Sequence, residues 1–444
     1  MRRETAGFCL DKHFSTIYHP TDRKSRRQKS GVRPFPPDTD TFSAGPLTGL
    51  LCMIAGITQK PFPREAWDLE RREQLAEDGF VAREKRRISM AAETHGQVFP
   101  AKRLEAFGAA ALAALGLPER DAALCAARMI DGDLRGVDTH GIFRLNHYSQ
   151  RIRLNGINLH PKVHTVRENA VTALVDGDNG MGHVVMNFAT ELAIRKATES
   201  GLAWVGTFNG NHAGAGAVYS SMPLAHDMVG MYMTVANANH MAPWGGVELM
   251  LGTNPISIAI PAGEEPPIVL DIATTVSSYG KVKLAAQKGE SIPVGWMIDR
   301  QGQPLTDPKR SSEGFLLPIG GYKGYGLNVV IGMLAGVLNG AAFGRNVVDF
   351  NKDLVSPNNS GHMIMAMRVD NFQPVEAFKR EMDRVIREIR ESKRMEGGER
   401  IWLPGEMEYE RIRERRERGI PLAPVVVANL RQLAVELNLS DRLE

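Results

Sequence analysis

Apolar residues recur at helical spacing in the first regularly patterned part of the chain. From Lys102 to Leu115 they fall at intervals of three and four residues, which predicts an amphipathic helix. A second helix is expected to begin at Pro118. A third is expected to begin with Asp138 or Thr139 as its N-cap and to end at Asn155-Gly156. The predicted inner faces are Leu104, Phe107, Ala111 and Leu115 in the first helix, and Ala123, Ala127, Ile130 and Leu134 in the second.

After Pro161 the pattern changes to short apolar strands that alternate with helices. Such alternation indicates α/β organisation. Beyond Ser291 the chain is rich in loop residues, and a very apolar helix, predicted to be fully buried, follows at Leu327 to Leu338. The C-terminal part returns to helices. The expected strands are 172–175, 202–208, 228–235, 256–260, 268–270 and 362–369; the expected helices between and after them are 181–199, 217–226, one with an apolar stripe from Val375 to Ile389, 409–418, and a last stripe from Val426 to Leu437.

These patterns divide the chain into four segments. Residues 1–89 lack sustained periodicity and are interpreted as a disordered or artefactual extension, with Met90 as a candidate true start. Residues 90–165 are expected to form the N-terminal helical part of a dimer and substrate domain. Residues 166–372 form the α/β cofactor- and substrate-binding domain, and residues 373–444 return to the first domain as helices.

Charge and composition exclude several classes of protein. The net charge of +3 arises in residues 1–89, where 17 basic residues face 12 acidic ones, while the remainder carries a balance of −2. The main body therefore gives no support for nucleic acid binding. No segment is long and apolar enough to span a bilayer, so no membrane partner is expected. The cysteines Cys9, Cys52 and Cys125 have no motif spacing and are typical of a reducing cytoplasm.

The stretch from Asp133 to Tyr148 is the first candidate for chemistry. His140, Arg144 and Tyr148 recur at a spacing of four and would share a helix face. A histidine at a helix start beside a cation has a lowered pKa, and this set suits a carboxylate. A solvated polar helix face explains the same spacing, and this stretch alone does not decide between the two.

Other polar residues are weaker candidates. The turn Gly214-Ala-Gly216 fails the dinucleotide (Rossmann) fingerprint because Tyr219 replaces the third glycine. His212 follows a strand end, where clefts open, although a lone histidine is more often structural. His140, His212, His240 and Asp271 lack close ligand spacing, so no metal site is predicted.

The second strong stretch is Gly320-Gly-Tyr-Lys-Gly-Tyr-Gly326. Dense glycine lets the backbone approach a ligand, the following helix offers free N–H groups, and Lys323 supplies charge for a phosphate. It is not a P-loop, because the lysine lacks the required spacing.

Seven motifs occur together and in order, and as a set they are highly specific. The chain from about Phe99 to its C-terminus resembles the malate/L-lactate dehydrogenase family of non-Rossmann NAD(P)-dependent oxidoreductases. In this family Ser is usual where the chain has Thr139, and the sequence Ala236-Asn-Ala-Asn-His-Met departs from the common family pattern. The motifs are Asp138-Thr-His-Gly with Arg144 and Tyr148, Asn211-His212, Pro243-Trp-Gly-Gly246, Gly252-Thr-Asn-Pro255, Leu270-Asp271, Asp307-Pro308 and Leu317 to Leu327.

The resemblance implies an α/β fold with a non-Rossmann NAD(P)-binding domain built on a mixed sheet, and a helical domain formed by both chain ends. It implies a homodimer that transfers a hydride between NAD or NADP and a small 2-hydroxy or 2-keto acid, of the malate, lactate, sulfolactate, ureidoglycolate or diketogulonate type. The alternative is a non-enzymatic protein of the same fold that binds small anions or nucleotides.

The resemblance also assigns residues to roles. His140 is the implied proton donor, Arg144 and Tyr148 hold the substrate carboxylate, and His212 lines the substrate pocket. Asp271 ends an apolar strand, where a buried carboxylate needs a partner, so we expect it to accept a ring N–H of His140 and fix its tautomer. The implied cofactor contacts are Ile268, Val269, Leu270, Asp271, Ile272, Ala273, Thr274, Tyr322, Lys323, Gly405, Glu406 and Met407.

Overall fold

The structure is a computed structural model that describes residues 96–444, without the side chains of residues 287 and 288. The predicted extension 1–89 and the candidate start at Met90 lie outside the described residues. No helix in the described part of the chain is both long and apolar enough to traverse a lipid bilayer.

A seven-stranded sheet forms the centre of the α/β part. Its strand order is β2-β3-β4-β10-β5-β6-β7. β3 and β4 pair in parallel and all other neighbours pair antiparallel, so the sheet is mixed, as predicted. The strands are β2 (His164–Glu168), β3 (Thr172–Asp176), β4 (Leu202–Gly210), β5 (Met228–Thr234), β6 (Ile256–Ile260), β7 (Ile268–Ile272) and β10 (Ser360–Arg368). Six of them were predicted; β2, which is largely exposed, was not.

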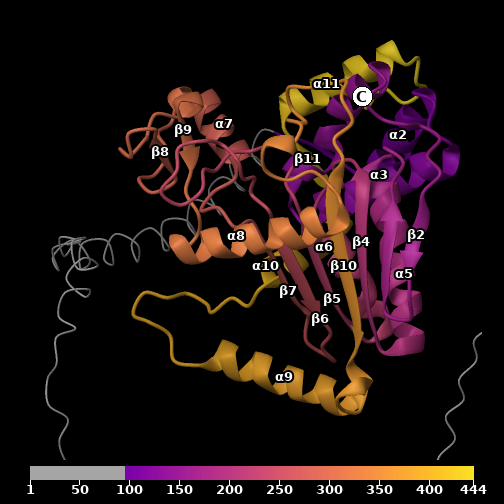
Figure 1. Cartoon of the computed structure of the whole chain (residues 1–444), viewed down its shortest axis with the longest axis vertical. Helices are drawn as coiled ribbons and strands as arrows, with labels where there is room; N and C mark the ends of the chain where they lie inside the picture. The colour runs from indigo at the N-terminus through magenta and orange to yellow at the C-terminus, as the bar shows by residue number, and fades with distance from the viewer. Residues whose placement is uncertain (1–95) are drawn as a thin grey trace, which may run out of the picture. The chain divides into compact units, whose positions relative to one another are not determined.

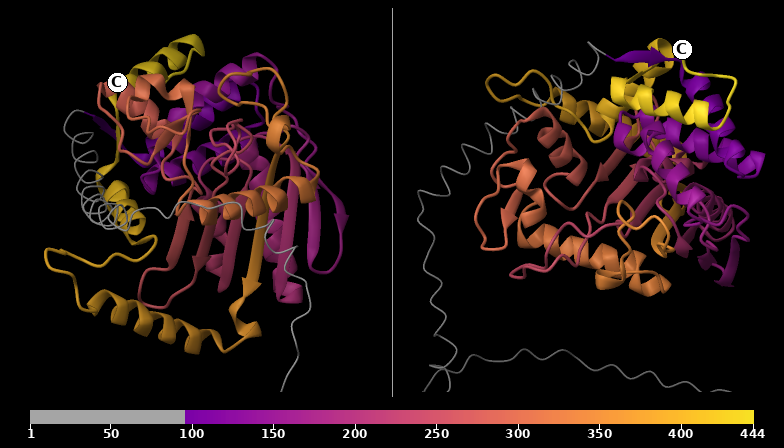
Figure 2. Two further views of the ribbon diagram at one scale, coloured as in Figure 1. Left: turned by 60° about the vertical axis from the view of Figure 1, so that its left-hand side comes forward. Right: turned by 90° about the horizontal axis from the view of Figure 1, so that it is seen from above.

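Helices cover both faces of this sheet. Successive side chains of a strand point to opposite faces. Ile364 of β10 packs in one core with α5 (Gly182–Ser200) and α6 (Gly216–Ser220), while its neighbour Met363 packs in another with α8 (Tyr322–Ala335). Figure 1 and the two views of Figure 2 show α8 running across the strands.

The two ends of the described chain build one helical part. β1 (Gln97–Phe99) pairs antiparallel with β11 (Ile420–Leu422), and one apolar core joins Phe99 and Leu104 to Leu430 and Leu433. This confirms the predicted helical domain formed by both chain ends, where indigo and yellow segments meet in Figure 1. Its helices are α2 (Ala101–Ala114), α3 (Glu119–Leu134), α4 (Leu145–Arg153), α10 (Glu406–Arg418) and α11 (Pro424–Glu436).

Three packing predictions need correction. The inner face of α3 is only partly as predicted: Ile130 and Leu134 are buried, but Ala122 and Ala126 are buried in place of the expected Ala123 and Ala127. α8 is not fully buried, because only one side of it rests on the sheet; its far side exposes apolar side chains. α9 (Val375–Glu391) lies against the turn between β6 and β7, where Asp383 accepts backbone N–H groups of residues 263–265, so the return to the helical part begins only with α10.

The predicted loop-rich region contains a small separate core. α7 (Tyr279–Lys288), which was not predicted, packs with β8 (Met297–Asp299) and β9 (Gly314–Leu316) around Val282 and Leu316. The short 3-10 helices outside the site are η3 (Met222–His226), η4 (Pro308–Glu313), η5 (Val337–Asn339), η6 (Gly344–Asn346) and η7 (Val369–Asn371).

Candidate active site

The segment that carries His140 and Arg144 is not one continuous helix. Two 3-10 turns, η1 (Asp138–His140) and η2 (Ile142–Arg144), precede α4, and Gly141 separates them. The Asp133 carboxylate of α3 accepts the N–H of Ile142 at 2.7 Å and lies 1.8 Å from where a Cβ of residue 141 would be. Only glycine allows this approach, and the contact draws the chain out of helical geometry. The predicted helix start at Asp138 or Thr139 is therefore wrong, while its end near Leu154 is confirmed.

An ion pair ties this turn to the C-terminal helices. Arg415 of α10 donates to both carboxylate oxygens of Asp138 and to the carbonyl of Asp133. Arg415 is 5% exposed, so the pair is shielded from competing water on its cationic side. The position of His140 thus depends on residues almost three hundred positions away.

His140 and His212 form the centre of the candidate site. Their ring centroids lie 5.4 Å apart with an angle of 30° between the planes. The Nδ1 of His140 lies 2.9 Å from the Thr139 hydroxyl. Burial, and secondarily the charge of Arg144, lowers the pKa of His140 to about 4, so its neutral form predominates at pH 7.

Arg144 lies beside this pair as a cation without an acidic partner among residues 96–444. Its Nε donates to the Thr139 carbonyl at 2.7 Å, and Nη1 lies 3.5 Å from the Asn351 side-chain oxygen. Its guanidinium carbon lies 6.0 Å from the centroid of the Phe350 ring. Since a partly buried guanidinium normally pairs with an anion, an anionic ligand fits here.

Tyr148 lies behind His212. Its side chain is 0% exposed, and its hydroxyl lies 2.7 Å from His212 Nδ1. Phe350, which sequence reasoning did not identify, stacks on His212 with centroids 5.0 Å apart. No local pattern marks Phe350, because it reaches the site from a loop about two hundred residues after Tyr148.

The predicted contact between Asp271 and His140 is not formed. Asp271 accepts the N–H of Ala217 at 3.0 Å, while the hydrogen-bonding neighbour of His140 is Thr139. The segment from Gly214 to Ala217 runs between the two residues: a Cβ at Gly214 would lie 3.4 Å from the His140 carbonyl, and one at Gly216 would lie 3.2 Å from Asp271 Oδ1.

Asp271 as a residue is exposed, contrary to the sequence expectation of a buried position. The bond that its carboxylate accepts from Ala217 is partly buried. Desolvation by the surrounding protein nevertheless raises the pKa of Asp271 to about 6, and the Ala217 N–H acts in the opposite direction.

The three segments predicted to contact the cofactor converge on the edge strand β7. Val269 N donates to the Pro404 carbonyl at 3.0 Å, and a Cβ at Gly405 would lie 2.8 Å from the Val269 Cβ. Just after the strand, Ile319 N donates to the Thr274 carbonyl at 3.0 Å and so brings the glycine-rich segment alongside.

Besides Asp271, two more side chains in these segments already have partners. Glu406 is buried and paired with Arg390 and Arg400, and Thr274 bonds to the Thr253 carbonyl and to Asn328. These two residues offer backbone at most. Tyr322 and Lys323 are exposed at the first turn of α8.

The backbone before α8 fits a dinucleotide phosphate. Gly320 and Gly321 have φ of 57° and 65°, values that favour glycine, and they lead directly into the helix N-terminus with its free N–H groups. Lys323 supplies a cation there. The residues present therefore fit a phosphate-bearing cofactor.

His240 has a structural partner. Its ring stacks on Tyr279 with centroids 4.3 Å apart and 5° between planes, and burial lowers its pKa to about 4. No group of three or more His, Cys, Asp or Glu side chains within residues 96–444 is arranged to hold a metal ion.

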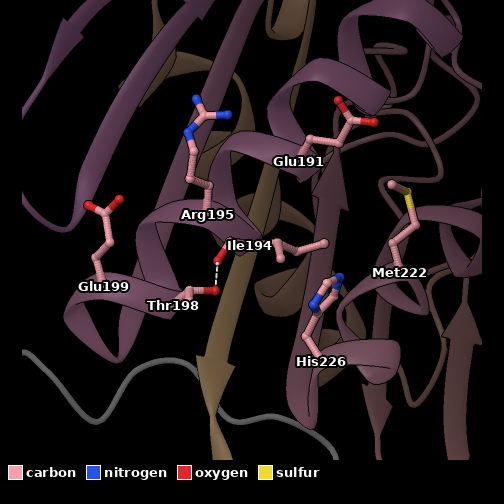
Figure 3. Close-up of a pocket in the computed structure, with 7 residues that line it drawn as sticks. All are labelled: Glu191, Ile194, Arg195, Thr198, Glu199, Met222 and His226. Carbon is pink, nitrogen blue, oxygen red and sulfur yellow. Dashed lines mark hydrogen bonds between the residues drawn. The ribbon is translucent and has the colours of Figure 1, made fainter.

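A surface pocket lies elsewhere, between α5 and η3 (Figure 3). It contains none of the predicted site residues, and its Thr198 hydroxyl is bonded to the Ile194 carbonyl. It is therefore separate from the His140 group. Its lining residues are Glu191, Ile194, Arg195, Thr198, Glu199, Met222 and His226.

Comparisons with known proteins place the chain in one family of dehydrogenases. Residues 99–431 match the family model described as malate/L-lactate dehydrogenase. A malate dehydrogenase from Pyrococcus horikoshii is 38% identical over 343 residues, 76% of this chain and 94% of that protein. A ureidoglycolate dehydrogenase (NAD(+)) from Escherichia coli O157:H7 is 32% identical over 307 residues, 69% of this chain and 87% of that protein. The structure of a sulfolactate dehydrogenase from Methanocaldococcus jannaschii superposes with a TM-score of 0.72 at 37% identity, covering 77% of this chain and 98% of that one.

Proposed function

The chain belongs to the malate/L-lactate dehydrogenase family, and from this premise we propose that it transfers a hydride between NAD(P)(H) and a small 2-hydroxy or 2-keto acid. One observation carries the proposal: Arg144, a partly buried cation without an acidic partner among the described residues, lies next to His140, whose neutral form predominates at pH 7. A carboxylate and an adjacent exchangeable proton are the two features that define a 2-hydroxy acid.

Arg144 binds the substrate carboxylate in this proposal. Its Nε is held by the Thr139 carbonyl, which leaves the outer N–H groups for the ligand. Phe143 and Phe350 flank the guanidinium, with centroids 5.6 Å and 6.0 Å from its central carbon. They restrict the rotation of the guanidinium and so help to hold it in place for an anion.

His140 moves the proton. In oxidation, the neutral ring accepts the hydroxyl proton of the substrate at Nε2 while Nδ1–H donates to Thr139; in reduction, the protonated ring returns it to the carbonyl oxygen. The substitution of the usual family Ser by Thr139 keeps the hydroxyl that this needs. The nicotinamide, when bound, supplies or accepts the hydride.

Backbone and charge around β7 hold the cofactor. We assign this role to Ile268–Thr274, to Tyr322 and Lys323, and to Gly405–Met407, with Lys323 and the α8 N-terminus facing the phosphates. Asp271 orients the Gly214–Ala217 segment instead of His140, because its carboxylate accepts the Ala217 N–H.

The protein acts as a homodimer in this proposal. The far side of α8 and the turn after it expose an apolar stripe that a second copy would cover. The stripe consists of Leu327, Val330, Met333, Val337 and Leu338, which are 37%, 53%, 50%, 59% and 64% exposed. We place the enzyme in the cytoplasm, in agreement with the free thiol of Cys125.

A substrate panel tests the proposed reaction. The full chain is assayed with malate-, lactate-, sulfolactate- and ureidoglycolate-type 2-hydroxy acids and NAD or NADP, and with the matching 2-keto acids and the reduced cofactors. We expect turnover of at least one acid, and a loss of roughly 10²–10⁴ in kcat in His140→Ala with NAD(P)H binding retained. If the protein binds NAD(P)H but turns over no acid of the panel, the alternative of a non-enzymatic nucleotide-binding protein is favoured.

A further inference from the structure

We propose that Tyr148 is a positioning residue: it holds His212 in the tautomer with the proton on Nε2, and His212 donates this N–H to an oxygen of the substrate. The tautomer is a property of the protein alone. The donation to substrate rests on the proposed function.

The hydrogen bond has one favourable direction. Tyr148 is completely buried, and His212 Nδ1, at 2.7 Å, is the recorded partner of its hydroxyl among residues 96–444. If Nδ1–H donated to Tyr148, the tyrosine hydrogen would have no acceptor in the described part of the chain. A buried donor without an acceptor is costly, whereas an unused lone pair costs less. The Tyr148 hydroxyl therefore donates to Nδ1.

Both partners are neutral at pH 7. Burial raises the pKa of the Tyr148 phenol, and burial, Arg144 and His140 together hold the pKa of His212 well below its ordinary value. A neutral imidazole carries one proton. Because Nδ1 accepts a hydrogen bond, the proton is on Nε2.

The ring of His212 is also fixed in orientation. It stacks on Phe350 at 5.0 Å with 23° between planes, and on His140 at 5.4 Å with 30°. Its Nε2 has no hydrogen-bond partner within residues 96–444 and is not among the fully enclosed unpaired atoms. The N–H is thus available to a ligand beside Arg144, where an electronegative oxygen is the complementary group.

This arrangement separates the roles of the two histidines. The lone pair of His212 is occupied by Tyr148, so His212 is a donor and not a base. His140 has only the Thr139 hydroxyl at Nδ1, and that hydroxyl can accept as well as donate. The nitrogen lone pair that takes the substrate proton therefore belongs to His140.

The tautomer can be measured directly. Long-range ¹H–¹⁵N spectra of histidine-labelled full-length protein report which ring nitrogen is protonated, and the His212 signals are assigned as those lost in His212→Gln. We expect His212 to be in the Nε2–H tautomer in the unsubstituted protein. In Tyr148→Phe we expect that this tautomer is no longer the single form. An Nδ1–H tautomer in the unsubstituted protein overturns the proposal even if Tyr148→Phe does not fold.

A double-mutant cycle separates positioning from direct substrate binding. Tyr148→Phe should lower kcat/KM roughly tenfold in the normal background and have no further effect in His212→Gln. An equal loss in both backgrounds would show that Tyr148 binds the substrate itself and would refute the positioning role. If no acid is turned over, the proposed function fails while the spectra still decide the tautomer.

Tyr232→Phe is the matched control. Tyr232 is 1% exposed and its hydroxyl lies 2.9 Å from His362 Nδ1, which the Thr234 hydroxyl also contacts at 2.8 Å, so a buried tyrosine–histidine contact is removed away from Arg144. We expect a loss of thermal stability in both variants, but an unchanged kcat/KM only in Tyr232→Phe.

Discussion

At the residue scale, Thr139 holds the two functional side chains of the candidate site. Thr139 supplies both a hydroxyl to His140 and a carbonyl to Arg144, at 2.9 Å and 2.7 Å. The two functional side chains are therefore held by one residue, and neither is paired with a carboxylate among residues 96–444. In the proposed function, the substrate supplies this anion.

The pH dependence follows from His140. Burial and Arg144 lower its pKa to about 4, against about 6.5 for a free histidine, so protonation requires pH values near 4. We expect kcat/KM for oxidation, which uses the neutral ring, to be flat above this value and to fall as pH falls through it. For reduction, which uses the protonated ring, kcat/KM should rise as pH falls toward about 4. This pH dependence is checked by pH–rate profiles in both directions, with intrinsic fluorescence to verify folding. A His140→Ala variant with the same profiles as the unsubstituted protein would contradict the assignment.

Arg144→Lys tests carboxylate recognition. Lysine keeps the charge but lacks the planar guanidinium that binds a carboxylate through two N–H groups. We therefore expect a lower kcat/KM, equivalent to a loss of roughly 2–4 kcal/mol of transition-state stabilisation, while the affinity for NAD(P)H is retained. Steady-state kinetics measure kcat/KM, and fluorescence titration measures the affinity for NAD(P)H. Arg153→Lys is the matched control, because Arg153 pairs with Glu436 on the surface and should tolerate the change. Unchanged KM and kcat in Arg144→Lys would reject the assignment.

At the element scale, close approaches decide where the functional segments lie. The Gly141 turn exists because the Asp133 carboxylate of α3 occupies the place of a side chain, and Gly405 sits where any Cβ would meet Val269 of β7. The glycines were visible in the sequence as permissive positions. The sequence did not show which neighbouring atoms approach these glycines, because α3 and β7 lie against them only in the folded chain.

The first turn of α8 should control cofactor affinity. Lys323→Ala removes an exposed cation beside the helix N-terminus, and we expect the Kd for NAD(P)H to rise by about 10- to 100-fold, the equivalent of a lost charge-assisted hydrogen bond. Fluorescence titration of NAD(P)H measures it. Lys393→Ala, which removes an exposed lysine after α9, is the control. An unaltered Kd in Lys323→Ala would show that this segment is not part of the cofactor site.

At the scale of the whole molecule, the apolar far side of α8 should determine assembly. A charge at Val330, the middle of the stripe, should prevent a second copy from covering it. We expect Val330→Glu to halve the mass measured by size exclusion with light scattering, while Val435→Glu, at an exposed apolar position of α11, leaves it unchanged. A dimeric Val330→Glu would place the interface elsewhere.

The sequence by itself determined the order and type of most elements, because hydrophobic periodicity is a local property. It predicted β6 and β7, the α/β organisation and the apolar character of α8. It also supplied the candidate chemical groups, because His140, Arg144, His212 and Lys323 stand in recognisable local motifs.

Only the tertiary structure decided which groups meet. Arg415 reaches Asp138, Phe350 stacks on His212, and Pro404 bonds to β7 across more than a hundred residues each. Contacts at such separations depend on how helices and sheet pack, which no local pattern encodes. For the same reason the expected pair of His140 and Asp271 is absent: the strand was predicted correctly, but packing placed the Gly214–Ala217 segment between them.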